Sequence, residues 1–227
     1  MSAIGTHDWS RVPAGLYHDF HQSWAVKLSG RLNASVLPQG YYSLVTRDVF
    51  PGTEAEGAIL GESDLAAYAR LANAITVYSE PDDAGVATIE IVSPGNKWCR
   101  AAVEDFRKKV LSRFERGQSL LVVDPLPLTD SAPGGLHAAI WDRRFGIAGT
   151  TVSDDRPICL VSYRAEPVGG GYVPEAYFSK VPFGEPLPRM PLMLTPERAV
   201  MVPLGESYAD AWETTPGRVK DLVHAAL

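Results

Sequence analysis

The sequence is poor in cysteine and has no long hydrophobic run. Cys99 and Cys159 stand far apart without a C-x-x-C partner, which argues against a disulfide framework and against a cysteine-based zinc site. No apolar stretch reaches the roughly eighteen residues of a transmembrane helix, so we predict no membrane association. The start, M-S-A-I-G-T-H-D-W, lacks the basic and apolar regions of a secretory signal, so we expect a cytoplasmic protein.

Signatures of two common enzyme classes and of nucleic-acid binding are also missing. There is no G-x-S-x-G turn, and the glycines at 169–171 are not followed by a helix start and a lysine, as a phosphate-binding loop requires. The formal net charge of -6 repels polyanions, so nucleic-acid binding would need a local basic patch. Trp9 and Trp24 are more typical of a core than of a base-stacking platform, because no arginine-rich surface accompanies them.

Hydrophobic periodicity predicts an α/β protein. Apolar residues at three- and four-residue steps predict helices over about 16–35 and 100–116. β-branched runs predict a hairpin of strands at 74–79 and 86–92. This order predicts a central mixed β-sheet flanked by helices. Further strands are predicted around 44–46, 119–124, 136–141 and 158–164.

A proline-rich region precedes the last residues of the chain. Residues 182–203 favour an extended strap that docks on the core, because proline lacks the backbone donor of a helix or a central strand. Two short helices are predicted after it. We expect a single domain over 1–227, with a core at about 14–165 and a C-terminal strap and helices at about 166–227.

The first candidate site is an acid within an apolar strand, Glu90 in V-A-T-I-E-I-V. An ionised carboxylate in such a place costs several kcal/mol unless it is paired or bound to a cation. The following turn, S-P-G-N-K, is suited to fold Lys97 back towards Glu90. Lys109 lies at the border of the apolar stripe of its predicted helix and within reach of the strand edge. A structural ion pair between Glu90 and a lysine is the alternative interpretation.

These residue types also fit hydrolysis of a phosphodiester. Carboxylates hold a divalent metal in such sites, and a lysine positions the water or neutralises charge on the phosphoryl group. Glu90, Lys97 and Lys109 are therefore the candidate catalytic residues, with Mg²⁺ or Mn²⁺ as the candidate metal. The segment 97–116 carries a net of four positive charges in this acidic protein.

A second, weaker candidate site consists of histidines. His18 and His21 lie one helical turn apart, which allows both imidazoles to meet one metal ion such as zinc. His7, Asp8 and Asp19 are candidates for further ligands. A histidine beside a packed aromatic stripe is more often hydrogen-bonded within the core, and this interpretation is favoured here.

Several segments resemble one bacterial family. In chain order they are H-D-W-S-R-V-P-A-G-L-Y-H-D-F-H-Q-S-W, L-P-Q-G-Y-Y, E-I-V-S-P-G-N-K and L-L-V-V-D-P, followed by D-R-P-I-C-L-V-S-Y, G-E-P-L-P-R-M-P-L and Y-A-D-A-W. On these segments the chain resembles the domain of unknown function 4058 family over nearly its whole length. The resemblance implies no established activity.

The E-I-V-S-P segment is also similar to the restriction-endonuclease-like fold, in which two strand acids and a lysine form a metal-dependent nuclease centre. This resemblance implies that Glu90 is the second acid and that Lys97 or Lys109 is the lysine. Relatives carry Pro-Asp on the preceding strand, where this chain reads T-E-A-E-G-A-I-L, so Glu54 or Glu56 would replace the first acid and metal ligand. Fewer carboxylates weaken a site for a hard cation.

Two functions follow from these features. One is a divalent-metal-dependent, nuclease-like hydrolase that acts on nucleic acid. The other is a catalytically inactive binding or scaffolding module for a protein partner, built on the same restriction-endonuclease-like core with its proline-rich C-terminal extension. The missing strand acid and the acidic net charge favour the second function.

Overall fold

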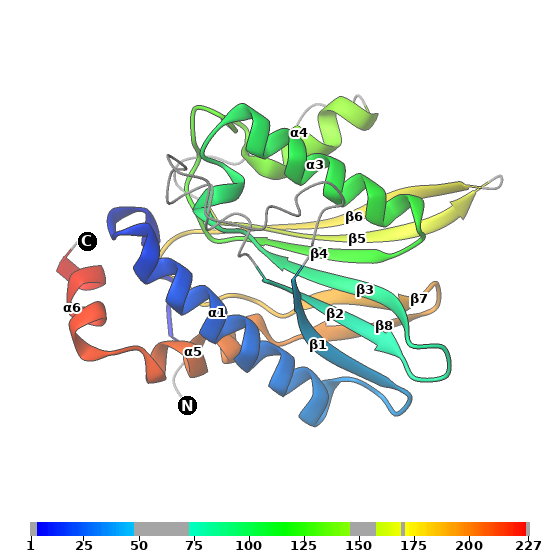
Figure 1. Cartoon of the computed structure of the whole chain (residues 1–227), viewed down its shortest axis with the longest axis horizontal. Coiled ribbons are helices and arrows are strands. Elements are labelled where there is room, and N and C mark those ends of the chain that lie inside the picture. The colour runs from blue at the N-terminus through cyan, green and yellow to red at the C-terminus, as the bar shows by residue number, and fades with distance from the viewer. Residues whose placement is uncertain (1–3, 48–72, 146–157, 169–170, 226–227) are drawn as a thin grey trace, which may run out of the picture.

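A six-stranded mixed sheet forms the centre of the computed structural model, which describes residues 4–47, 73–145, 158–168 and 171–225 (Figure 1). Its strands follow the order β1-β2-β3-β4-β5-β6, and β3 and β4 are parallel while the other neighbours are antiparallel. The predicted mixed sheet is therefore confirmed. The strands are β1 (Tyr41–Arg47), β2 (Asn73–Ser79), β3 (Ala84–Ile91), β4 (Ser119–Asp124), β5 (Ile158–Val168) and β6 (Gly171–Val181).

The crossover between β3 and β4 positions the candidate site. A short 3-10 helix (Pro94–Asn96) turns the chain after β3, and α3 (Arg100–Glu115) carries it back over the sheet. Gly117 ends this helix at φ 69°, a left-handed conformation that glycine adopts without strain. All six residues of β4 are buried because β4 has a neighbour on each side and is covered on both faces, and its four central residues are all apolar.

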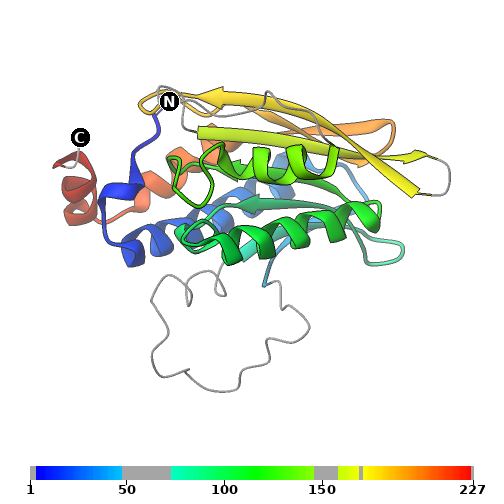
Figure 2. The same cartoon turned by 90° about the horizontal axis from the view of Figure 1, so that it is seen from above.

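Helices cover both faces of the sheet. α3 and α4 (Gly135–Phe145) lie side by side over β4, β5 and β6 (Figure 1), where Phe114 of α3 packs against Tyr163 of β5 with ring centroids 5.2 Å apart. α1 (Ala14–Arg31) packs on the other face, where the hydroxyl groups of Ser29 and Ser43 lie 2.9 Å apart. The hairpin of β7 (Met190–Thr195) and β8 (Arg198–Val202) contacts β3, β4 and β5 on the side away from α3 (Figure 2).

The C-terminal helices pack beside α1. The predicted apolar stripe of α1 is buried, and Trp24 within it donates its indole N–H to Ser207 of α5 (Leu204–Thr214) at 3.0 Å. α6 (Gly217–Ala225) follows α5. A five-residue π-helical turn (Leu32–Val36) and a 3-10 turn (Trp9–Arg11) flank α1. None of the described helices combines the length and apolar character that a membrane-spanning segment needs.

Two sequence predictions differ from the structure. Residues 136–141 were predicted as a strand and form part of α4, in which Leu136 and Ile140, four residues apart, are both buried. Six residues are too few to distinguish the apolar spacing of a helix from that of a strand. The segment 182–203 is predicted as an extended strap, but residues 190–202 within it form the β7–β8 hairpin, which contacts the sheet through β7. Glu54 and Glu56 lie outside the described residues.

We expect the substitution Tyr208→Phe to lower the free energy of unfolding by about 2–4 kcal/mol, because it removes the acceptor of two buried N–H groups. The Tyr208 hydroxyl accepts the backbone N–H of His7 at 3.2 Å and the indole N–H of Trp9 at 3.0 Å. Urea denaturation measures the change. The control Tyr177→Phe removes a hydroxyl from a residue that is 60% exposed, and an equal loss in both variants would contradict the prediction.

Candidate functional site

Glu90 lies on β3 beneath α3 and pairs with cations of that helix. Lys109 Nζ donates to Glu90 Oε2 at 2.8 Å, and Arg113 Nη2 lies 4.0 Å from Oε1. Glu90 is buried, and so are Ala74 and Val122 opposite it on the two neighbouring strands. Of the two candidate lysines, the structure therefore brings Lys109 to Glu90.

Lys97 pairs with a different carboxylate, that of Asp124 at the end of β4. Its Nζ lies 3.1 and 3.0 Å from the two carboxylate oxygens, 3.1 Å from the carbonyl oxygen of Leu126 and 2.8 Å from that of Pro127. An ammonium group has three donors, and these four oxygens occupy all of them. The side chains of Lys97 and Asp124 are only 2% and 3% exposed, so this is a closed internal ion pair.

Local structure explains why Lys97 turns towards β4. The Ser93 backbone N–H and hydroxyl both donate to Asn96 Oδ1, at 2.9 and 3.0 Å, which closes the turn after β3. β3 and β4 are parallel, so their carboxyl ends lie at one edge of the sheet, and the turn places Lys97 beside Asp124. The sequence pattern marks Asp124 only as the last residue of the predicted strand 119–124. Its place at the end of a strand parallel to β3 was the signal that could have identified it.

Burial also shapes the chemistry of Asp124. Removal from water raises the pKa of its carboxyl group above the ordinary value, and the nearby ammonium of Lys97 opposes this effect. The backbone N–H of Leu126 adds a hydrogen bond to Oδ1 at 3.3 Å. The pair thus joins the turn after β3 to the segment after β4 and leaves no donor of Lys97 for a ligand.

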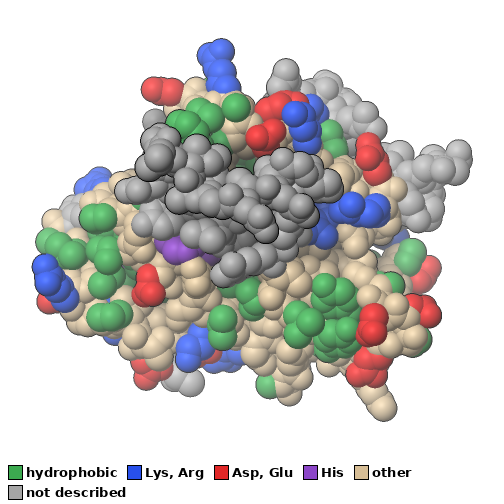
Figure 3. Space-filling view, viewed as in Figure 1, with side chains coloured by type: hydrophobic (Ala, Val, Ile, Leu, Met, Phe, Trp, Pro, Cys, Tyr) green, Lys and Arg blue, Asp and Glu red, His purple; other side chains and the backbone are tan. Residues whose placement is uncertain are grey.

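The remaining cations of α3 are largely neutralised within the chain. Arg107 donates to Glu104 at 2.9 Å, and Lys108 lies 3.6 Å from Asp105. Two further cations of the helix face Glu90. Where side chains of described residues are visible in Figure 3, basic and acidic ones are interspersed. Five of the seven cations between residues 97 and 116 therefore face a carboxylate within the described part of the chain.

His21 and His18 occupy different environments on α1. His21 is fully buried and its Nε2 lies 2.7 Å from the carbonyl oxygen of Ile91, so Nε2 carries the proton and donates. Burial lowers the pKa of His21 to about 4. His18 Nε2 contacts the side-chain amide of Gln22. The two histidines thus take part in separate hydrogen bonds.

The other proposed metal ligands are dispersed. His7 hydrogen-bonds to Tyr208, and Asp8 caps the first 3-10 turn and pairs with Arg11 at 3.0 Å. Across the described ranges, no group of three or more histidine, cysteine, aspartate or glutamate side chains is placed to hold a metal ion. Asp19 therefore belongs to no such group. A metal site that joins Glu90 to Glu54 or Glu56 stays a prediction, because the latter two are not described.

We expect Lys97→Met to lower the free energy of unfolding by about 3–5 kcal/mol, because it leaves the Asp124 carboxylate buried without its partner. The matched control is Lys108→Met, since the side chain of Lys108 is 64% exposed and its ion pair is long. Urea denaturation of both variants measures the difference. Similar small losses in the two would mean that the Lys97–Asp124 pair is not structural.

Acidification should destabilise the protein through its buried histidines. Burial lowers the pKa of His7, His21 and His137 to about 4, whereas an unfolded histidine titrates near 6.5. The unfolded chain therefore takes up protons first, so this stability is complete above about pH 6.5 and falls as the pH drops towards 4. We expect a loss of about 1 kcal/mol per pH unit for each histidine, measured by urea denaturation.

The variant His21→Gln keeps a side-chain donor and removes the titrating ring. Its free energy of unfolding should fall less steeply between pH 7 and pH 5 than that of the wild-type protein. Carboxylates titrate in both proteins, so their contribution to the pH dependence of the free energy of unfolding is the same in both. Identical slopes would show that His21 is protonated equally in the folded and unfolded states.

Comparison of the chain with known proteins found no match. No family model matches the chain, and no curated protein or solved structure is significantly similar to it. The resemblances carried by the sequence segments therefore stay predictions, and the geometry described above is the basis for assigning a function.

Proposed function

We propose that the chain is a catalytically inactive binding or scaffolding module on a restriction-endonuclease-like α/β fold. The observation that carries this proposal is the complete engagement of Lys97, whose ammonium group lies within 3.1 Å of four internal oxygens. A catalytic lysine must reach the scissile phosphate or its attacking water. Lys97 is sealed from solvent, and Lys109 is turned towards Glu90.

The charge distribution supports a partner other than nucleic acid. The net charge is -6, and most cations of α3 have acidic partners within the chain. Protein binding to nucleic acid depends on cations that replace condensed counterions along the phosphates. A protein or small-molecule partner therefore fits these surfaces better.

A metal-dependent phosphodiesterase is the second candidate. The observation that favours it is the contact of 2.8 Å between Lys109 Nζ and Glu90 Oε2, because the sequence resemblance implies a lysine beside the second strand acid. Glu54 or Glu56 would supply the other carboxylate. The mixed sheet flanked by helices is compatible with both functions.

Calorimetric titration of Mn²⁺ and Mg²⁺ into the wild-type protein and Glu90→Gln separates the two candidates. The substitution removes the charge and nearly conserves shape. For the inactive module we expect no saturable binding in either protein, together with a loss of about 1–3 kcal/mol in the free energy of unfolding of Glu90→Gln, because Lys109 and Arg113 lose a charged acceptor.

The control is Glu104→Gln, which neutralises another carboxylate that is paired with a cation of α3, but one that is 31% exposed. Its effect on stability should be below about 1 kcal/mol. Saturable metal binding that is lost in Glu90→Gln and kept in Glu104→Gln, accompanied by phosphodiester hydrolysis, would overturn the proposal in favour of the nuclease.

A further inference from the structure

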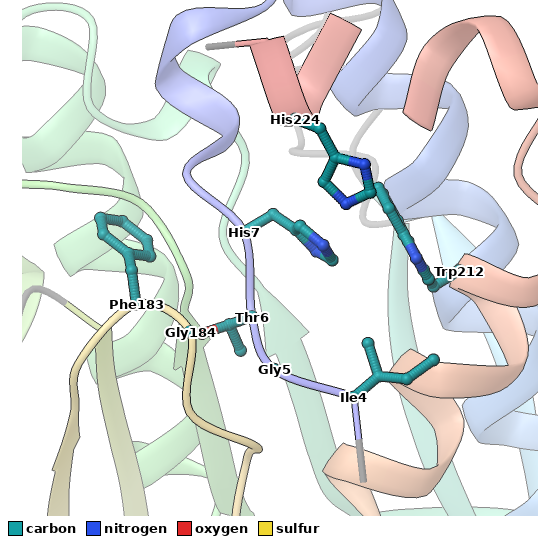
Figure 4. Close-up of a pocket in the computed structure, with 8 residues that line it drawn as sticks. All are labelled: Ile4, Gly5, Thr6, His7, Phe183, Gly184, Trp212 and His224. Carbon is teal, nitrogen blue, oxygen red and sulfur yellow. The ribbon is translucent and has the colours of Figure 1, made fainter. Parts of the chain in front are cut away.

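A pocket of about 400 Å³ lies where the N-terminal segment meets the turn after β6 and the helices α5 and α6 (Figure 4). This volume is in the range of small-molecule sites, roughly 300–1,000 Å³. Its lining is predominantly apolar, with side chains of Ile4, Phe183 and Trp212, and its ring nitrogens come from His7 and His224. No acidic side chain lines it among the described residues.

Backbone contacts hold one wall of the pocket in place. The Thr6 N–H donates to the Glu185 carbonyl at 3.0 Å, and the Gly184 N–H donates to the Thr6 carbonyl at 2.9 Å. A Cβ atom on Gly5 would lie 2.0 Å from the Gly184 carbonyl oxygen, so the two segments can approach this closely only because Gly5 has no side chain. Gly184 itself has φ 85°.

Aromatic rings form the opposite wall. The His7 imidazole stacks on the Trp212 indole with centroids 3.8 Å apart and an interplanar angle of 21°. The His224 ring, on α6, lies 5.5 Å from His7 and 5.6 Å from Trp212. Figure 4 shows the His7 ring between the N-terminal segment and the Trp212 indole, with the His224 ring next to both.

The hydrogen bonds of Tyr208 determine the protonation of His7. The Tyr208 oxygen accepts two N–H groups, from the His7 backbone and the Trp9 indole, which occupy both of its lone pairs. Its own proton must then be donated to His7 Nδ1, 2.9 Å away. His7 is consequently neutral with its proton on Nε2, in agreement with the lowering of its pKa to about 4 by burial and by His224.

Nε2 of His7 therefore carries a proton that it can donate to a ligand. His7 is 8% exposed and lines the pocket, and within the described part of the chain no group pairs with this nitrogen. This nitrogen faces the pocket and is not one of the fully buried atoms without a partner, so a ligand carboxylate that replaces water there gains a hydrogen bond from it. His224 offers a second, solvent-exposed imidazole to the same ligand.

We propose that this pocket binds a small monocarboxylate with an apolar or aromatic body. The carboxylate accepts from Nε2 of His7 and from His224, and the body packs against Ile4, Phe183 and Trp212. A carboxylate fits because it has two acceptor oxygens and no donor, whereas an amide brings N–H groups to a lining without acidic side chains. The inference goes beyond the proposed function and uses none of the residues around Glu90, so either can fail without the other.

Phenylacetate and its neutral isostere phenylacetamide test this site in the full chain. Calorimetric titration into the wild-type protein should show saturable binding of phenylacetate and at least tenfold weaker binding of phenylacetamide. His224→Ala should weaken phenylacetate binding by about fivefold or more, equivalent to about one hydrogen bond. The control Leu222→Ala changes a residue of the same helix that is 45% exposed and does not line the pocket, and it should leave the affinity unchanged.

A second variant, Ile4→Trp, fills the pocket from a position that is only partly buried and should abolish binding while circular dichroism shows a folded protein. Absence of saturable phenylacetate binding in the wild-type protein would overturn the proposal. Equal affinity for phenylacetamide would overturn the carboxylate assignment. Unchanged affinity in both His224→Ala and Ile4→Trp would place the ligand elsewhere on the molecule.

Discussion

The pair between Lys97 and Asp124 is the constraint on which the candidate site depends. It joins the carboxyl ends of two adjacent parallel strands, and α3 begins three residues after Lys97, with Cys99 as its N-cap. The pair therefore fixes where α3 starts, and the helical repeat then carries Lys109 over Glu90. A buried ion pair contributes little net stability compared with apolar residues, but a charge without its partner is very costly, so the pair favours one arrangement of the crossover.

A second long-range connection joins the two ends of the chain. The Tyr208 hydroxyl binds His7 and Trp9 across about two hundred residues, and Phe20 packs against the same ring with centroids 5.0 Å apart. Residues of α1, the sheet, β7 and α5 belong to one hydrophobic cluster. The same contacts that close this cluster also shape the pocket and leave its histidine neutral, so stability and a binding surface have a common structural origin in this region.

The two regions differ in what they offer to a ligand. Around Glu90 and Lys97, acids and cations face one another at hydrogen-bonding distance and satisfy their charges internally. In the pocket near Trp212, a donor is fixed by its neighbours and opens towards an apolar space. A donor that faces an open apolar space can pair with a ligand directly, whereas charges that are paired inside the protein can bind a ligand only if the internal pair breaks.

The sequence alone determined the elements with clear patterns: the apolar stripe of α1, the apolar repeat of α3, and β4 with its four consecutive apolar residues. It also indicated that Glu90 needs a cation. Only the tertiary structure decided that this cation is Lys109. A lysine side chain is long enough to reach several carboxylates, and the parallel pairing of β3 and β4 places Asp124 next to Lys97. The six residues 136–141 fit a helix or a strand equally well by sequence, and only the packing that buries both Leu136 and Ile140 distinguishes the two. The protonation of His7 depends on Tyr208, which local sequence cannot bring to it.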